Sequence, residues 1–478
     1  MSWQSRIYNK YRLDEPIIKI ISDFTGLLLS HDFLEFLIQE NRKYIIAKSI
    51  PEIINSQSED DRLIITAQLN IPSFLKKQVD TYTFRFEDIP FNGSTNLLSN
   101  FETKEIISIL EYLDAENPHF SLTQKNYKEL ADAASQYQSI KECHKYIRQI
   151  KDRMNEELSL DSVRFISDNW SKLQYQSYLS GDTSFTELTT SIDHYCSPFF
   201  ESGMWKDVFY SAPSSPLSID KIIPNIKTDK SVKKALLCFD CMGIPEWYLL
   251  KNYLDSLDLT YEESYIFSLI PSITSIARSA IYAGTYSVYD KSSPGQRSEE
   301  KDLKSHFGDD KTKYLREKDY KSKDDFIGYN TVSISLNFFD DLSHSAIIQE
   351  SSLNKFAYYN SVRDYLSKSK VLDIFQDLVS EGFSIYICSD HGSTIAKGNG
   401  QKLDKFIQDK FAKRGTLIDK ESAPLIKQKT IIIPFIDDKL VVIPENREMF
   451  SNKDEYEINH GGISIDEMIV PYVKVIKE

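Results

Sequence analysis

The sequence predicts an α/β protein whose second half forms a mostly parallel sheet flanked by helices, preceded by a small α/β unit and a helical region. The first observation is an alternation of apolar strand-length runs with amphipathic segments from residue 234 to residue 476, which favours parallel strands joined by helices. The second is composition, because 41% hydrophobic residues with 28 Tyr and 27 Phe suffice for sizeable cores. The length of 478 residues suggests about three domains.

Residues 1–95 are expected to form a small α/β domain. An apolar run of strand length at 16–22 is followed by a segment, 31–39, that has Phe and Leu at helical spacing. Two further apolar runs, at 43–47 and 62–67, are typical of strands. The order strand, helix, strand favours a small parallel sheet.

Residues 96–230 are predicted to be a helical region that ends in a linker. The stretch 125–158 lacks glycine and spaces its apolar residues by three and four positions, as helices do. Ser and Pro cluster at 211–216, which is typical of a linker.

The third domain is expected at residues 231–478, with strands and helices in alternation. Strands are predicted at 234–239, 264–270, 331–339, 382–388, in a hairpin of 429–433 with 440–443, and within 463–476. Helices are predicted at 244–257, 275–283 and 353–378. A charge-dense segment at 290–325 interrupts this alternation and is expected to be a solvated insertion, with a lid over a site as the alternative.

The charge balance limits the classes of partner. The chain has 57 Lys and Arg against 71 Asp and Glu, a net charge of −14, which makes it a poor candidate for coating DNA through charge alone. A local site would contact nucleic acid only if a metal supplied the positive charge. No apolar run approaches the roughly 18 residues of a membrane span, and the start of the chain lacks an apolar signal stretch, so no membrane partner is expected.

The five cysteines favour a cytoplasmic location. Their number is odd and their spacing is not that of a disulfide framework, which is typical of a reducing compartment. Cys238 and Cys241 form a lone C-x-x-C pair. We interpret them as core cysteines, with a redox or zinc role as the alternative, because there is no second pair.

Polar residues follow the apolar strand runs of the third domain, at the positions where open parallel sheets bind ligands. A single Asp or His in such a turn is usually a cap or a satisfied polar residue, but five such turns together favour a metal site. Three of the eight histidines lie in them. The residues are Asp240, Thr274, Asp340 with His344, Asp390 with His391, and His460.

This set of side chains suits phosphoryl chemistry on metal ions. Imidazole and carboxylate without thiolate are suitable ligands for Zn²⁺, Mn²⁺ or Fe. Two cations a few ångströms apart can clamp the attacking and leaving oxygens of a phosphoryl group. A threonine at the start of a helix is a suitable nucleophile, because a metal can deprotonate it and the backbone N–H groups there favour phosphate oxygens.

The motifs that carry these residues resemble the alkaline phosphatase superfamily, and most closely its PglZ domain, over about residues 231–478. They are Phe239-Asp240-Cys241-Met242-Gly243, Pro271-Ser272-Ile273-Thr274 with Ala277-Arg278, Asn337-Phe338-Phe339-Asp340 with His344, Ser389-Asp390-His391-Gly392, and His460-Gly461-Gly462-Ile463-Ser464 with Val470-Pro471. The resemblance implies an alkaline-phosphatase-like sheet and two divalent metal ions, Zn²⁺ with Mn²⁺ as the alternative. One ion is expected on Asp240, Thr274, Asp390 and His391, and the other on Asp340, His344 and His460.

Some of these assignments have competitors in the sequence. Asp341 competes with Asp340, but only Asp340 has the four-residue spacing to His344 that the superfamily shows. Cys241 lies next to a proposed ligand and has no matched role.

The nucleophile and its neighbours also leave alternatives open. Ser272 and Ser275 compete with Thr274, which is preferred because it matches the proline-x-x-threonine of the superfamily. Arg278 lies one helical turn beyond Thr274 and is expected to contact the substrate phosphate, with a surface or helix-pairing role equally open.

The N-terminal residues add a narrower resemblance. Trp3, the run 17–23 and the residues Gly26-Leu27-Leu28 are similar to the start of PglZ proteins from BREX-type phage-defence systems. We therefore expect a metal-dependent phosphodiesterase or phosphatase with a threonine nucleophile in bacterial anti-phage defence. Its expected partners are a phosphate ester, with nucleotide or nucleic acid among the candidates, and other defence-system proteins. The alternative is a non-catalytic or weakly catalytic scaffold subunit of a defence complex, with a metal-stabilised fold.

Overall fold

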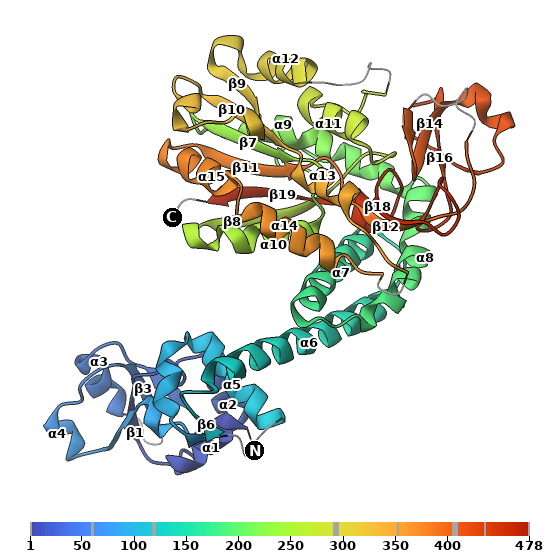
Figure 1. Ribbon diagram of the computed structural model, residues 1–478. Helices are drawn as coiled ribbons and strands as arrows, with labels where there is room; N and C mark the ends of the chain where they lie inside the picture. Colours follow the sequence, from blue (N-terminus) through green and yellow to red (C-terminus); the bar gives the residue numbers. More distant parts are fainter. Residues whose placement is uncertain are drawn as a thin grey trace. The chain divides into compact units, whose positions relative to one another are not determined.

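The computed structural model describes residues 2–58, 62–116, 121–289, 296–350, 353–403, 410–434 and 436–476. The chain divides into two compact units, Met1–Glu142 and Cys143–Glu478 (Figure 1). The division at residues 95 and 230 that the sequence suggests stays a prediction, because compactness does not test which segments fold independently.

The first unit contains a four-stranded parallel sheet in the order β2-β3-β1-β4. Its elements are α1 (Trp3–Lys10), β1 (Lys19–Asp23), α2 (His31–Gln39), β2 (Tyr44–Ile46), α3 (Ile50–Asn55), β3 (Leu63–Ala67), α4 (Ser73–Lys76) and β4 (Asp80–Phe84). All of β1 is buried, as is most of β3, so these apolar runs form the centre of the sheet. The small parallel α/β unit expected from the sequence is confirmed.

Four long helices follow along the chain: α5 (Thr103–Ala115), α6 (Tyr127–Arg153), α7 (Leu160–Ser180) and α8 (Leu188–Glu201). Helix α7 begins where the side chain of Ser159 accepts a hydrogen bond from the backbone of Ser162, and it ends at Gly181 in the left-handed conformation. The helical region is therefore present. None of the described helices combines the length and the apolar character that crossing a bilayer requires.

The second unit is built on a six-stranded sheet in the order β8-β19-β11-β7-β10-β9. Strands β11, β7, β10 and β9 run parallel, and β19 runs antiparallel to both β11 and β8. The mostly parallel sheet predicted from the sequence is confirmed. The strands are β7 (Lys234–Phe239), β8 (Thr260–Phe267), β9 (Thr312–Arg316), β10 (Thr331–Leu336), β11 (Ser384–Ser389) and β19 (Ile469–Ile476).

Strand β7 shows that this sheet is covered on both faces. Leu236 and Cys238 belong to one hydrophobic cluster, and Leu237 and Phe239 belong to another. Because successive side chains of a strand point to opposite faces, each face of the sheet carries a core of its own. Helices including α9 (Ile222–Thr228), α10 (Ile244–Leu254), α11 (Thr274–Ala283) and α15 (Val371–Ser380) lie beside the sheet in Figure 1.

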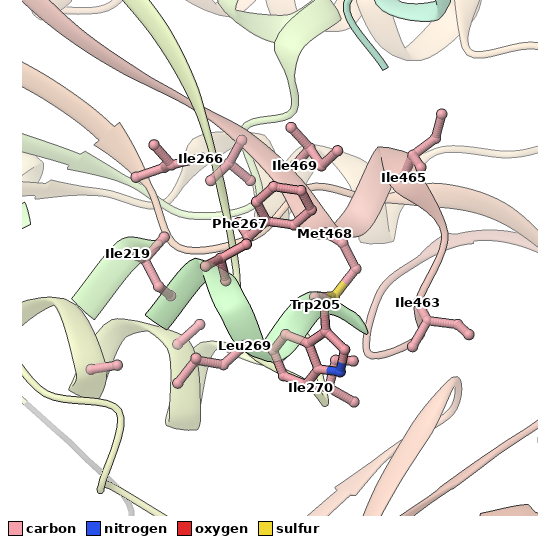
Figure 2. Packing of buried hydrophobic residues seen from close by; sticks show 14 of the residues in the cluster. Trp205, Ile219, Ile266, Phe267, Leu269, Ile270, Ile463, Ile465, Met468 and Ile469 are labelled. Atoms are coloured by element: carbon pink, nitrogen blue, oxygen red, sulfur yellow. The ribbon is translucent and has the colours of Figure 1, made fainter. Parts of the chain in front are cut away.

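One of these cores supports two loops that carry predicted site residues. Figure 2 shows part of it, around the fully buried Trp205. The cluster includes Ile270, which lies shortly before Thr274, and Ile463, which lies shortly after His460. Both loops are therefore anchored by buried side chains in the same apolar cluster.

Two small sheets precede the last strand. One has the order β17-β12-β18 and the other has the antiparallel order β13-β14-β16-β15, which includes the hairpin predicted at 429–433 and 440–443. Their strands are β12 (Thr394–Gly398), β13 (Lys410–Ala412), β14 (Gly415–Asp419), β15 (Lys429–Ile432), β16 (Lys439–Ile443), β17 (Glu448–Met449) and β18 (Tyr456–Asn459).

Two expectations for the third domain are wrong. Within the charge-dense segment, residues 290–295 lie outside the described residues, but 296–325 is not a solvated insertion, because it contains α12 (Gln296–Phe307) and the edge strand β9. The single helix predicted at 353–378 is two helices, α14 (Phe356–Leu366) and α15, separated by a short Ser- and Lys-rich turn.

Candidate metal centre

The predicted site residues lie at one edge of the six-stranded sheet because the strands before them run in the same direction. Asp240 directly follows β7, and Asp390 and His391 directly follow β11, which pairs with β7 in parallel. Asp340 lies on α13 (Phe338–Ser345), which follows β10, the other parallel neighbour of β7. Carboxyl ends of parallel strands meet at one edge, so these side chains converge.

The first group consists of Asp240, Asp390 and His391. One potential ligand atom of each lies within 4.8 Å of the others, and all three residues are buried. The Nε2 atom of His391 is 3.6 Å from Oδ1 of Asp240 and 3.9 Å from Oδ1 of Asp390. We call these three residues the first cluster.

Thr274 joins the first cluster through its hydroxyl group. Its Oγ1 donates a hydrogen bond of 3.1 Å to Oδ1 of Asp240 and lies 3.0 Å from Nε2 of His391. The residue is the first of α11 and is only partly buried, so its hydroxyl group combines fixed partners with access from outside.

The second group consists of Asp340, His344 and His460, and we call it the second cluster. Asp340 and His344 are one turn apart on α13, which places them on the same face of the helix. The Nε2 atoms of His344 and His460 lie 3.3 and 3.5 Å from Oδ1 of Asp340. Here too, one potential ligand atom of each residue lies within 4.8 Å of the others.

The two clusters are neighbours because β12 and β18 pair in antiparallel fashion. Thr394, three residues after His391, is the partner of Asn459, which immediately precedes His460. The imidazole rings of His391 and His460 are stacked, with centroids 4.2 Å apart and an interplanar angle of 19°. The seven predicted ligands, drawn from about 220 positions of the chain, thus form one continuous site.

The histidine rings present the same nitrogen to the site. Nδ1 of His391 is 3.1 Å from the carbonyl oxygen of Gly392, and Nδ1 of His460 is 3.2 Å from that of Ser272. A carbonyl oxygen can only accept, so each Nδ1 carries the proton. The Nε2 atom of each ring therefore faces the cluster, as in histidines that bind metals.

Burial and charge shift the pKa values of the clustered groups in different directions. Burial, with the nearby charge of Asp390, raises the pKa of Asp240 to about 6. Burial, with help from His460, lowers the pKa of His391 to about 4, so this ring is neutral at neutral pH. Burial alone would raise the pKa of Asp340, but His344 and His460 outweigh it and hold that pKa well below its ordinary value.

The donor set fits divalent cations. Oδ1 of Asp340 is buried and makes no hydrogen bond of ordinary geometry to any described residue, although two imidazole nitrogens face it. Buried carboxylate oxygens are normally satisfied, so this convergence of lone pairs favours a bound cation. Carboxylate oxygens and imidazole nitrogens in groups of three or four suit Zn²⁺ and Mn²⁺.

Arg278 does not have the surroundings expected for a group that contacts substrate. Its side chain is buried, with Nη2 2.5 Å from Oδ2 of Asp240 and Nε 3.2 Å from Oδ2 of Asp390. Nη1 donates to Ser335 and Asn337 at 3.2 and 3.3 Å. Nε and Nη1 thus donate to protein acceptors, whereas Nη2 is buried against Asp240 without a hydrogen bond, and the phosphate contact expected from the sequence stays a prediction.

The competing residues lie apart from the ligand positions. Asp341 is exposed and lines a neighbouring cleft rather than either cluster. The hydroxyl group of Ser272 is buried, donates to the carbonyl oxygen of Gly462 at 2.9 Å and accepts from the backbone N–H of Gly461 at 3.0 Å. Ser272 therefore supports the loop that follows His460.

Two residues that the sequence analysis missed brace the same loop. Glu467, on the short helix α16 (Ile465–Met468), accepts hydrogen bonds from Arg414 and from the backbone N–H groups of Gly462 and Ser464. Its pattern with Ser464 is a capping box, Ser-x-x-Glu, which was legible in the sequence as a helix start. The contact with Arg414, on the turn before β14, had no such local signal.

A cleft of about 850 Å³ lies beside the centre. It shares Ser335 and Asn337 with the surroundings of Arg278, and Asp341 adjoins the second cluster. Its walls combine basic, acidic and aromatic side chains, which are Arg316, Lys318, Lys368, Lys370, Glu317, Asp364, Tyr320, Phe338 and Tyr365. The basic residues outnumber the acidic ones only slightly once Asp341 is included.

The fold and the site define an α/β domain of the alkaline-phosphatase-like class. The family model of the BREX system PglZ alkaline phosphatase-like domain matches residues 219–475, which is more than half of the chain. The protein therefore belongs to the PglZ family.

Comparison with other proteins gives weaker likenesses. No curated protein matches the sequence. Among solved structures, murine ectonucleotide pyrophosphatase/phosphodiesterase 5 is similar at 12% identity and a TM-score of 0.33. The human protein of the same name is similar at 14% identity and a TM-score of 0.32. Each of these comparisons covers 50% of this chain and 87% of the solved chain.

Proposed function

We propose that this protein is a metal-dependent phosphoric ester hydrolase, a phosphodiesterase or phosphatase, with Thr274 as its nucleophile. The observation that carries the proposal is the position of the Thr274 hydroxyl group. It lies within 3.1 Å of both Asp240 and His391, at the start of a helix and beside a second cluster of ligands. A threonine that only began a helix would not require two clusters of carboxylate and imidazole groups beside its hydroxyl group.

The two clusters would hold two divalent cations, Zn²⁺ or Mn²⁺. Asp240, Asp390 and His391, with Thr274, would bind one, and Asp340, His344 and His460 would bind the other. When bound, the cations would supply the positive charge that favours ionisation of the threonine hydroxyl and neutralises phosphate oxygens.

The chain itself would orient the nucleophile and the phosphate. Asp240 and His391 hold Oγ1 of Thr274 at the mouth of the site. The first backbone N–H groups of α11 have no acceptor within the helix and favour phosphate oxygens. Attack of Oγ1 on phosphorus would form a phosphothreonine ester and release the alcohol of the substrate. Water would then hydrolyse that ester, which frees Thr274 and the phosphate product.

The neighbouring cleft supports a substrate larger than a simple phosphate ester. Lys318, Lys368 and Arg316 line this cleft and would attract additional phosphates. A nucleotide or a nucleic acid strand carries such additional phosphates. The two cations of the centre, together with these basic residues, would allow a chain with a net charge of −14 to bind such an anion.

The test uses an aryl phosphodiester and an aryl phosphomonoester with protein that has been stripped by chelation and reloaded with Zn²⁺ or Mn²⁺. Thr274→Ala is expected to lower kcat by about 1,000-fold or more, because no other nucleophile replaces Oγ1. Ser275→Ala, in the same helical turn, is the matched control and should retain activity within about threefold. Hydrolysis by Thr274→Ala at the parent rate would contradict the assignment.

One observation favours a second candidate, a scaffold with little turnover. Arg278 already places a positive charge between Asp240 and Asp390, so the first cluster has a counter-charge from the chain. A scaffold would bind cations and other defence-system proteins, yet hydrolyse none of the esters above the blank. Affinity capture of the neighbouring gene products on the full chain would then be the informative assay.

The location that we propose is the cytoplasm. All five cysteines are free and buried, which supports a reducing compartment. A role in anti-phage defence rests on membership of the PglZ family of BREX systems.

A further inference from the structure

Arg278 is a buried cation inside the proposed metal centre, and its contacts divide the oxygens of two ligands. It faces Oδ2 of Asp240 and Oδ2 of Asp390. The opposite oxygens face the first cluster, because Oδ1 of Asp240 accepts from Thr274 and Oδ1 of Asp390 lies 3.9 Å from Nε2 of His391. Each carboxylate thus has one oxygen against the guanidinium group and the other on the side of the first cluster, where Oδ1 of Asp390 also accepts from the backbone N–H groups of Cys241 and His391 at 3.2 and 2.9 Å.

The guanidinium group is itself held in one orientation. Its Nη1 donates to Ser335 and Asn337, on and just beyond β10, and Ser335 donates to Asn337 at 3.0 Å. The side chain is 5% exposed, so water does not compete for these donors. A planar guanidinium group that is hydrogen-bonded through Nε and Nη1 and ion-paired through Nη2 aligns two carboxylates in a way that a flexible ammonium group does not.

The second cluster has no such contact. Asp340 is approached by His344 and His460, and among the described residues of the centre Arg278 pairs with Asp240 and Asp390 alone. The two clusters therefore differ in how their ligands are prepared. The first is aligned by a fixed cation from the chain together with backbone contacts to Asp390 and His391, and the second by helix spacing and by the backbone contact of His460.

We propose that Arg278 is a positioning residue for the cation of the first cluster, and that the second cluster does not depend on it. This inference rests on the proposed function, since it concerns how the same centre is loaded. Groups that orient metal ligands typically contribute about 10- to 100-fold in metal affinity when they are removed. The effect is therefore expected at one of two cations.

Charge and alignment have to be separated in the test, because they act in opposite directions. Removing the positive charge of Arg278 strengthens the attraction for a cation, whereas removing the planar guanidinium group loosens Asp240 and Asp390. Arg278→Lys keeps the positive charge and removes the planar guanidinium group, so its effect on cation binding reports the alignment of the two carboxylates alone. Arg363→Lys, on the exposed face of α14, is the matched control.

The experiment is calorimetric titration of the chelated full-length protein with Zn²⁺, together with a melting curve for each variant. The parent is expected to bind two cations. Arg278→Lys should bind one of them about 10- to 100-fold more weakly and the other as the parent does. When His344→Ala has removed a ligand of the second cluster, Arg278→Lys should weaken the binding of the cation that remains. When Asp390→Ala has removed a ligand of the first cluster, Arg278→Lys should leave the binding of the remaining cation unchanged.

Parent-like binding of both cations by Arg278→Lys would overturn the inference. Weaker cation binding that appears only when Arg278→Lys is combined with Asp390→Ala would also overturn it. If Arg278→Lys does not fold, Asn337→Ala removes one support of the guanidinium group and keeps the charge. It should weaken the same cation, and unchanged binding of both cations would then overturn the inference. Failure of the proposed function is distinct, because it appears as two bound cations without ester hydrolysis.

Discussion

Replacing Glu467 by Gln tests whether the loop that carries His460 depends on a buried ion pair. Glu467 receives Nε and Nη2 of Arg414, each at 2.9 Å, and both side chains are at most 1% exposed. It also accepts from the backbone N–H groups of Gly462 and Ser464 at 2.8 and 3.1 Å. In Glu467→Gln an NH₂ group would face these donors, and the charge of Arg414 would stay buried without its partner.

The size of the effect follows from the ionisation of this carboxyl group. Burial alone would raise the pKa of Glu467, but Arg414 outweighs it and lowers the pKa from 4.5 to about 2. A shift of this size corresponds to about 3 kcal/mol of folding free energy. Breaking a buried ion pair by removing one partner typically costs about 3 to 5 kcal/mol. Both lines of reasoning predict that Glu467→Gln lowers the free energy of unfolding by about 3 kcal/mol or more.

The assay is urea unfolding at pH 7, followed by tryptophan fluorescence. Three of the four tryptophans, Trp170, Trp205 and Trp247, lie in the second unit, so the signal reports mainly on it. Glu457→Gln is the matched control, because Glu457 pairs with Lys413 in the same region but is partly exposed. That variant should lose less than about 1 kcal/mol.

The pH dependence gives a second check on the same pair. A carboxyl group with a lowered pKa in the folded state contributes stability that is fully present above its unfolded pKa and is lost as the pH falls through the folded pKa. The difference in the free energy of unfolding between the parent and Glu467→Gln should therefore be constant above pH 4.5 and become smaller between pH 4.5 and about 2. A gap below about 1 kcal/mol at pH 7, or one that does not shrink in acid, would refute the reasoning.

Gly392→Ala should yield insoluble protein or abolish Zn²⁺ binding, because a Cβ at this position would lie 2.0 Å from the carbonyl oxygen of Asp466. A soluble variant that binds Zn²⁺ as the parent does would contradict this close packing. Cys241 has a φ of +64°, so Cys241→Gly should be more stable than Cys241→Ala by about 1 kcal/mol in urea, and the reverse order would argue against strain at this turn. Chelation should lower the melting temperature and Zn²⁺ at about 100 times its Kd should restore about 2.7 kcal/mol, whereas an unchanged curve would mean that no cation binds the folded state. Lys368→Glu in the cleft should raise KM for a dinucleotide several-fold and leave KM for a small aryl diester unchanged. An equal change in KM for both substrates would show that the larger substrate does not bind in the cleft.

Sequence patterns predicted the central strands and the candidate ligands that the structure brings together, because both depend on local rules. Strand β7 has the predicted bounds, since a strand that is covered on both faces is a continuous apolar run. Asp240 and Asp390 were predicted because each comes directly after such a run. His344 was predicted because it follows a strand run and has the four-residue spacing to Asp340 that the superfamily shows, and in the structure this spacing is one turn of α13.

The features that were missed depend on contacts between distant parts of the chain. Arg278 lies where the helical spacing puts it, but its direction is decided by Ser335 and Asn337 on another strand. His460 lies before the last strand, as expected, but the strand that directly precedes it, β18, was missed because its pairing with β12 is long-range. Strand β9 was hidden in a charged segment because edge strands carry charged residues and lack a clear apolar run.

That edge strand has a practical consequence for anyone who wishes to shorten the protein. Because the charged segment looks dispensable in the sequence, deleting it would seem a harmless way to obtain a smaller fragment of the second unit. Such a deletion would instead strip β10 of its neighbour and leave a row of backbone N–H and C=O groups open to other molecules. The truncated product would be prone to stick to itself, at the strand that leads directly into α13 and its ligands.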